Sequence, residues 1–164
     1  MIYEFSCNFD TPFKLIIVGD GPKLQDLKEL VKELNITNLV EFKGSVPASQ
    51  VKYFLDIADI FLSFYEGSNL GNPLLEAIRM NKLIVTLNNG TTGDYIKHQY
   101  NSLIYDENDL NYKLIVNDLI HLISNIKIIE KLKFNLKKTE SEKLLTWKQR
   151  FEKELIEVNK IIKT

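Results

Sequence analysis

Cysteine is almost absent from this sequence, and long apolar runs are missing. Cys7 is the one cysteine among 164 residues, which excludes an intrachain disulfide framework and favours a reducing compartment. No stretch approaches the roughly 18–20 consecutive apolar residues of a membrane-spanning helix. The first residues also lack the pattern of a signal peptide, so we expect a cytoplasmic protein.

A charge bias of either sign is missing too. Lys and Arg number 21 and Asp and Glu number 22, which gives a net charge of −1. No bulk electrostatic field therefore attracts nucleic acid, and we expect no nucleic-acid partner. His98 and His121 lie far apart and have no partner at the spacing of a metal site or a Ser/His pair, so we expect no metal.

One local excess of basic charge lies near the C-terminus. Seven lysines fall between residues 127 and 148, but Glu130, Glu140 and Glu142 are interspersed among them. This mixture favours a solvated helix face over a membrane-binding one. We therefore expect membrane contact to be at most peripheral, at the inner face of the membrane.

The length and the hydrophobic content of 45% suit one packed domain over residues 1–164. Short apolar runs alternate with helical patterns, as in βαβ units. We predict an α/β fold with a Rossmann-like parallel sheet of about five strands flanked by helices. The core covers 14–106, and the tail over 107–164 is helical and ends in a long amphipathic helix. The expected strands cover 15–18, 39–42, 60–64, 83–87 and 102–105, the first of them buried on both faces.

In open parallel sheets, ligands bind beyond the carboxyl ends of the strands, and three loops there contain glycine. The first loop, residues 19–22, contains Gly19, Gly21 and Pro22. It is not the dinucleotide-binding fingerprint, because Leu24 stands where the third glycine belongs. The third loop, residues 88–94, could border a phosphate, or Thr91 or Thr92 could simply cap a short helix with Tyr95. From the residues alone, an ordinary strand-to-helix turn is the favoured interpretation of the first loop, and a capped turn fits the third loop at least as well as a phosphate site.

The second loop lies between two carboxylates. Glu66 directly follows the third strand, and Glu76 lies about one turn into the next helix. The start of that helix, at 71–74, has unpaired N–H groups that suit an anion, and a carboxylate suits the vicinal diol of a ribose. An acidic residue near a helix start is also favourable for the helix dipole alone, and spacing by itself favours that interpretation.

These segments, in this order, resemble a known family. The sequence is similar to the C-terminal, donor-binding half of GT-B fold glycosyltransferases of family 4, also called glycosyl transferases group 1. The resemblance covers about 14–106, and Trp147 with the last helix fits the family's usual ending. The matching pieces are LIIVGDGP at 15–22, VEFKGSVP at 40–47, ADIFLS at 58–63, YE and LLEA within 65–77, LIVT at 83–86 and GTTGDYI at 90–96.

The resemblance implies a retaining glycosyltransferase that uses a nucleoside diphosphate sugar, UDP- or GDP-linked, as donor substrate, with no tightly bound cofactor. Glu76 would bind the ribose, and Glu66, the catalytic candidate, would lie beside the donor sugar. A carboxylate near the positive charge that develops on the sugar is stabilising, as are helix N–H groups near the leaving diphosphate. Further nucleotide-binding positions are Gly71, Asn72, Pro73 and Leu75 at the helix start, and Gly19, Gly21, Pro22, Gly44 and Val46 near the base and phosphates.

The sequence departs from the family pattern in two places. Nine residues separate Glu66 from Glu76, more than the family motif has. Either an insertion lies within 67–70, which we favour, or Ser68 takes the first motif position. The family's first strand, with its Arg- and Lys-bearing turn, has no counterpart. Residues 1–9 match the end of the helix that would follow that strand, so the strand ending at Val18 should be unpaired on one side.

We therefore expect the donor half of a hexosyltransferase that makes a cell-surface polysaccharide or a lipid-linked glycan. The glycan or lipid-linked acceptor would bind a missing N-terminal domain, so the isolated chain should be inactive. Two alternatives remain. One is a non-catalytic nucleotide-sugar-binding subunit that works with a separately encoded partner. The other is an unrelated flavodoxin-like regulatory α/β domain.

Overall fold

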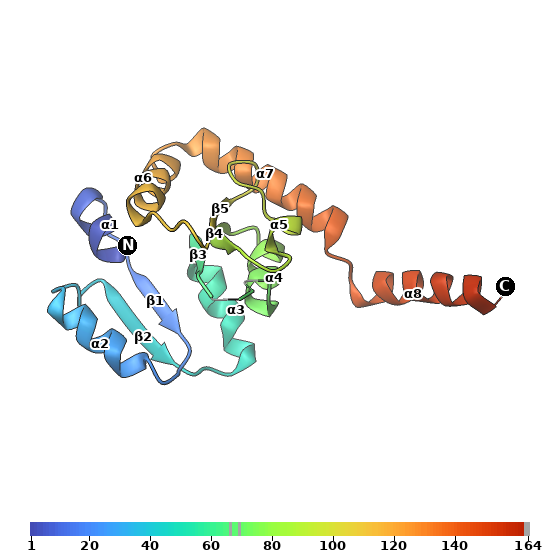
Figure 1. Cartoon of the computed structure of the whole chain (residues 1–164), viewed down its shortest axis with the longest axis horizontal. Helices are drawn as coiled ribbons and strands as arrows, with labels where there is room; N and C mark the ends of the chain where they lie inside the picture. The colour runs from blue at the N-terminus through green and yellow to red at the C-terminus, as the bar shows by residue number, and fades with distance from the viewer. Residues whose placement is uncertain (66, 69, 163–164) are drawn as a thin grey trace. The chain divides into compact units, whose positions relative to one another are not determined.

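The structure is a computed structural model that describes residues 1–65, 67–68 and 70–162 (Figure 1). Its elements form two compact units. The first contains Met1–Ala58 and Leu110–Ile126, and the second contains Asp59–Asp109 and Lys127–Thr164. The described strands are all parallel and are flanked by helices, which confirms the predicted α/β class.

The first unit contains a two-stranded parallel sheet. In this sheet Leu15 lies opposite Val40, and the register shifts between Ile17 and Val18. The helices α2 and α3 follow the two strands in βαβα order, as the alternating pattern predicts. The elements of this unit are α1 (Ile2–Asn8), β1 (Leu15–Val18), α2 (Leu24–Glu33), β2 (Val40–Gly44), α3 (Ala48–Ile57) and α6 (Tyr112–Ile123).

The strand β1 is more exposed than its sequence suggests. A continuous Leu-Ile-Ile-Val run predicts burial on both faces, yet no residue of β1 is fully buried and Val18 is 37% exposed. That prediction is wrong. Within the described residues, β1 hydrogen-bonds only to β2, and α2 buries none of its side chains. The side chains of β1 are therefore only partly buried. Among the described residues, no second strand pairs with the other edge of β1, as the resemblance leads us to expect.

The second unit contains a three-stranded parallel sheet in the order β3-β4-β5. Ser63 pairs with Thr86, and Val85 pairs with Leu103. The central strand β4 is buried from Leu83 to Leu87, and Leu74 of α4 and Leu136 of α7 are also buried in this unit. The elements are β3 (Ile60–Ser63), α4 (Asn72–Arg79), β4 (Leu83–Asn88), α5 (Thr92–Tyr95), β5 (Leu103–Asp106), α7 (Ile126–Lys143), whose first residue belongs to the first unit, and α8 (Trp147–Ile162).

Two asparagines end helices as the sequence predicts. Asn35 follows α2 with φ 53°, and Asn81 follows α4 with φ 52°. Asparagine tolerates this left-handed conformation better than most residues, so it ends a helix without much strain. The N–H of Asn81 donates to the carbonyl oxygen of Ile78 over 3.0 Å, which closes the last turn of α4.

A buried amide joins the loop before β5 to α7. Asn101 is 1% exposed, and its Oδ1 accepts the N–H of Lys97 over 2.8 Å. Its Nδ2 donates to the carbonyl oxygen of Tyr95 over 2.8 Å and to Oγ1 of Thr139 on α7 over 3.0 Å. All of these groups belong to the second unit, so Asn101 connects segments that lie far apart in the sequence.

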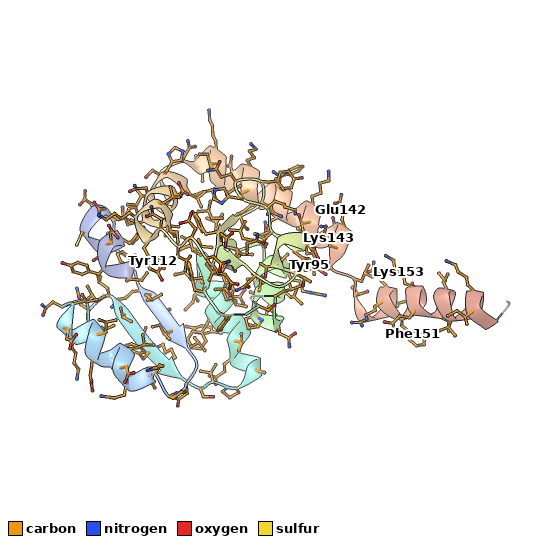
Figure 2. All side chains as sticks on the ribbon, viewed as in Figure 1. Tyr95, Tyr112, Glu142, Lys143, Phe151 and Lys153 are labelled. Atoms are coloured by element: carbon orange, nitrogen blue, oxygen red, sulfur yellow. The ribbon has the colours of Figure 1, made fainter. Side chains whose placement is uncertain are left out.

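The helix α8 begins with a capping box. The N–H of Thr146 donates to Oε1 of Gln149 over 2.8 Å, and the N–H of Gln149 approaches Oγ1 of Thr146 at 3.3 Å. The predicted C-terminal helix is confirmed, but its described side chains are exposed, including Phe151 at 65% (Figure 2). Across the described part of the chain, no helix has the length and apolar character needed to cross a membrane.

Replacing Thr86 by valine is expected to raise the free energy of unfolding by about 1 kcal/mol. The side chain of Thr86 is fully buried, and its hydroxyl has no hydrogen-bond partner among the described residues. Valine keeps the shape and removes an unsatisfied polar group. Urea denaturation of Thr86→Val measures the change, with the exposed Thr37→Val as control. A stability loss specific to Thr86→Val would contradict the assignment of an unsatisfied hydroxyl.

Candidate functional site

The carboxyl ends of β3 and β4 bring two of the three glycine-containing loops to one edge of the second unit's sheet. Because β3 and β4 are parallel neighbours, the loop after Ser63 and the loop after Asn88 leave the sheet on the same side. The loop after Ser63 leads into α4, and the loop after Asn88 leads into α5. This edge of the second unit therefore carries the predicted diphosphate- and ribose-binding segment.

The N-terminus of α4 is open in the way that an anion site requires. Gly71 is the N-cap, with extended backbone at φ −123° and ψ 177°, and it has no side chain to cap the helix. Pro73 has no N–H, and the N–H groups of Asn72 and Leu74 have no acceptor within the helix. The N–H of Leu75 is already used, because it donates to the carbonyl oxygen of Gly71 over 3.1 Å. Among the described residues of α4, the N–H groups that remain for a ligand are therefore those of Asn72 and Leu74.

Glu76 is the fifth residue of α4, and its side chain is exposed. The sequence places it about one turn into the helix, and the structure confirms this position. Because Glu76 lies beyond the first turn, the helix dipole contributes little at its position. The structure therefore weakens the alternative in which Glu76 only complements that dipole.

The first position of the two-glutamate motif has two candidates, Glu66 and Ser68. Glu66 lies outside the described residues, so its predicted place beside a donor sugar stays a prediction. Ser68, the alternative, is exposed and lies against Gly90, where an added Cβ would be 2.6 Å from its Oγ. Gly90 has φ 55°, which also favours glycine there.

The loop after β4 differs from its predicted form. Thr91 takes the N-cap position of α5 but makes no capping hydrogen bond, because its backbone at φ −99° and ψ 15° is not extended. Thr92 is buried, and its Oγ1 has no partner in the described part of the chain. Neither threonine therefore caps α5 through its side chain. A contact that the sequence did not suggest supports α5: Nζ of Lys143 on α7 lies 5.8 Å from the ring centre of Tyr95 (Figure 2).

A hollow of about 340 Å³ lies beside this loop. Its polar lining includes Asp94, Lys97 and His98, and the Nδ1 atom of His98 lies 2.8 Å from the carbonyl oxygen of Ile104. The opposite charges of Asp94 and Lys97 give it no net preference for an anion. It is therefore a weaker phosphate site than the N-terminus of α4. Within the described residues, no cluster of His, Cys, Asp and Glu side chains could hold a metal ion.

Sequence reasoning missed Asn89. Its side chain is 5% exposed, and its Nδ2 donates to the carbonyl oxygen of Tyr65 over 2.8 Å and to Oε2 of Glu107 over 2.8 Å. Asn88, directly before it, is exposed. The alternation of a strand's side chains predicts that these two neighbours face opposite sides, but it does not say which of them turns inward.

The first unit brings its two predicted loops together. The N–H of Gly19 donates to the carbonyl oxygen of Gly44 over 2.8 Å, so the loops that follow β1 and β2 are adjacent. Gly19 and Gly44 have φ values of 134° and 67°. A Cβ at either position would meet no atom within 4 Å, so glycine is required at these two positions for its backbone conformation rather than for space. Gly21 also has no atom within 4 Å of an added Cβ, and its φ is not positive. Pro22 and Val46 lie in the same two loops, and a nucleotide-binding role for these residues stays a prediction.

Comparison with known proteins decides the family. The model of the family described as glycosyl transferases group 1 matches residues 7–153. The chain belongs to this family. Among curated relatives, the 2-deoxystreptamine N-acetyl-D-glucosaminyltransferase of Niallia circulans is 27% identical over 113 residues, which are 65% of this chain and 29% of the relative. The alpha-monoglucosyldiacylglycerol synthase of Streptococcus pneumoniae R6 is 32% identical over 98 residues, which are 59% of this chain and 22% of the relative. The chain thus spans less than a third of the length of these two relatives.

Solved structures of glycosyltransferases have the same fold. The C-terminal domain of a glycosyl transferase group 1 family protein from Francisella tularensis superimposes with a TM-score of 0.73 at 18% identity, covering 87% of this chain and 77% of that one. An Anabaena protein in complex with UDP and glucose superimposes with a TM-score of 0.69 at 17% identity, covering 86% of this chain and 40% of that one. The predicted GT-B C-terminal fold is confirmed.

Proposed function

We propose that this chain binds a nucleoside diphosphate sugar and forms the donor side of a retaining hexosyltransferase. The observation that carries the proposal is the open N-terminus of α4 with the exposed carboxylate of Glu76 one turn further along. Membership of the glycosyl transferases group 1 family supports it.

In this proposal each group has a separate task. The N–H groups of Asn72 and Leu74, together with the helix dipole, stabilise the negative charge that builds up on the diphosphate as the bond to the sugar breaks. The carboxylate of Glu76 accepts hydrogen bonds from the two ribose hydroxyls. Glu66 is assigned to the sugar, where its charge stabilises the developing positive charge at the anomeric carbon.

The relatives support candidates for the base and for the acceptor. UDP is the first candidate nucleotide, because the similar Anabaena structure contains UDP and glucose, and GDP is the second. One relative is named for a diacylglycerol glycolipid, which supports a lipid-linked acceptor and peripheral contact with a membrane, and a polysaccharide acceptor is the other option. In this proposal the acceptor binds outside the 164 residues, so these residues alone bind a donor without transferring its sugar.

Calorimetric titration of the chain with UDP, GDP and ADP tests the proposal. We expect saturable binding of UDP or GDP and much weaker binding of the matching nucleoside, because the nucleoside lacks the diphosphate that α4 would hold. Flavin mononucleotide, titrated in parallel, should not bind. Flavin binding without any nucleoside diphosphate binding would contradict the proposal and favour a flavodoxin-like domain.

A further inference from the structure

Two part-buried hydrogen bonds join Asn89, which directly follows β4, to the loop after β3 and to Glu107 after β5. Asn89 donates both hydrogens of its amide, one to the carbonyl oxygen of Tyr65 and one to the carboxylate of Glu107, each over 2.8 Å. The Asn89 side chain is 5% exposed, and both of its hydrogen bonds are part-buried. Tyr65 directly precedes Glu66 in the sequence, so Asn89 holds the backbone immediately before Glu66.

The next residue, Gly90, contacts the same loop on the other side of Glu66. A Cβ added to Gly90 would lie 2.6 Å from Oγ and 3.0 Å from Cβ of Ser68. No side chain fits between the two loops at this point, because such short distances require a shift of Ser68. Asn89 and Gly90 therefore contact the described residues that flank Glu66 in the sequence.

We propose that Asn89 is a positioning residue for the donor sugar: it fixes the Glu66-bearing loop to the end of β4 through the carbonyl oxygen of Tyr65. This inference rests on the proposed function, in which that loop faces the sugar. The carboxylate of Glu107 completes the arrangement, because it accepts the second hydrogen of the Asn89 amide and orients the first toward Tyr65.

The chemistry at position 89 requires an amide. The two described acceptors of the Asn89 Nδ2 group are a carbonyl and a carboxylate, so the nitrogen between them must supply two donors. Aspartate has the same shape and supplies none when ionised. Asn89→Asp therefore replaces two hydrogen bonds by two repulsive oxygen–oxygen contacts, with no change of volume.

A set of four variants separates the Tyr65 bond from the Glu107 bond. Asn89→Asp loses both bonds. Glu107→Gln alone places a second side-chain amide beside the amide of Asn89. Asn89→Asp combined with Glu107→Gln restores a hydrogen bond between the two side chains, now donated by Gln, but leaves the carbonyl oxygen of Tyr65 without its donor. Asn117→Asp is the control, because it makes the same substitution at an exposed position on α6.

The first readout needs no ligand. Hydrogen exchange of the amides within residues 64–71 is expected to be about 5–13-fold faster in Asn89→Asp and in the double variant, because a lost hydrogen bond of about 1–1.5 kcal/mol corresponds to that factor. Exchange should be unchanged there in Asn117→Asp. Normal exchange over 64–71 in the double variant would overturn the role of the Tyr65 bond.

The second readout concerns the sugar. UDP-glucose, UDP-N-acetylglucosamine and GDP-mannose are each titrated beside their nucleoside diphosphate, and the ratio of the two affinities isolates the sugar's contribution. We expect this ratio to fall about tenfold in Asn89→Asp and in the double variant, with the affinity for UDP or GDP alone nearly unchanged. A general loss of structure would instead weaken both ligands together.

The outcomes distinguish the two proposals. If the wild-type chain binds neither nucleoside diphosphates nor their sugars, the proposed function is wrong and the positioning role falls with it. If the wild-type chain binds them and Asn89→Asp leaves the affinity ratio unchanged, the positioning role alone is wrong.

A second variant, Gly90→Ala, tests the contact with Ser68, which follows Glu66 in the sequence. It keeps the proposal testable if Asn89→Asp misfolds. Gly90→Ala pushes Ser68 away and should speed exchange over 64–71. Gly90→Ala combined with Ser68→Gly should reverse the part of that change that comes from the clash with Ser68, because the nearest remaining atom, Cα of residue 68, lies at an ordinary contact distance of 3.6 Å. The strain of a side chain at φ 55° is the same in both variants. Equal exchange in the single and double variants would show that the contact does not hold the loop.

Discussion

Replacing Asn101 by alanine is expected to lower the free energy of unfolding by about 3–4 kcal/mol, a large part of the stability of a domain of this size. Three hydrogen bonds are lost at once, from the Lys97 N–H and to the Tyr95 carbonyl and the Thr139 hydroxyl. Because the side chain is 1% exposed, water cannot readily replace them. Guanidinium denaturation followed by circular dichroism measures the loss.

Asn135→Ala is the matched control for Asn101→Ala. Asn135 also donates from its side chain to a carbonyl oxygen, that of Tyr100 over 2.7 Å, but this bond is exposed. We expect a loss of at most about 1 kcal/mol for this variant. Similar losses for the two asparagines would mean that burial of Asn101 contributes nothing, which would contradict the account of the second unit's packing.

The sequence predicted the elements better than it predicted their burial. The expected strands lie within about two residues of the observed ones, because each is an apolar run that glycine, asparagine or proline interrupts. The run at β1 misled us about burial, because such a run shows that a strand can be buried but not whether other elements cover it. Burial depends on tertiary partners, and in the part of the chain that the structure describes β1 pairs only with β2.

The candidate site could be predicted only in part, because some of its contacts also depend on tertiary partners. The start of α4 and the position of Glu76 follow from local signals, namely glycine, proline and helical spacing. The roles of Asn89 and Asn101 depend on partners far away in the chain, Glu107 and Thr139. An asparagine in a loop has the same local signature whether it faces water or is buried, so spacing alone could not reveal either role.

Glu76→Ala is expected to weaken nucleoside diphosphate binding by about 10–100-fold, because hydrogen bonds to a charged group are worth about 1.5–3 kcal/mol. The fold should be unaffected, since Glu76 is exposed and the change in unfolding free energy should stay within about 0.5 kcal/mol. Titration calorimetry measures the affinity, and thermal unfolding checks the fold. Glu130→Ala, which removes another exposed glutamate in the same unit, should change neither.

The most direct test of the donor-binding claim pairs this variant with a change in the ligand. UDP, or GDP if that is the nucleotide bound, and its 2′,3′-dideoxy analogue are titrated into the wild-type chain and Glu76→Ala. If Glu76 binds the ribose hydroxyls, the variant loses about 10–100-fold in affinity for the natural nucleotide and almost nothing for the analogue. Equal losses for the two ligands, or no loss for either, would contradict the assignment of Glu76 to the ribose.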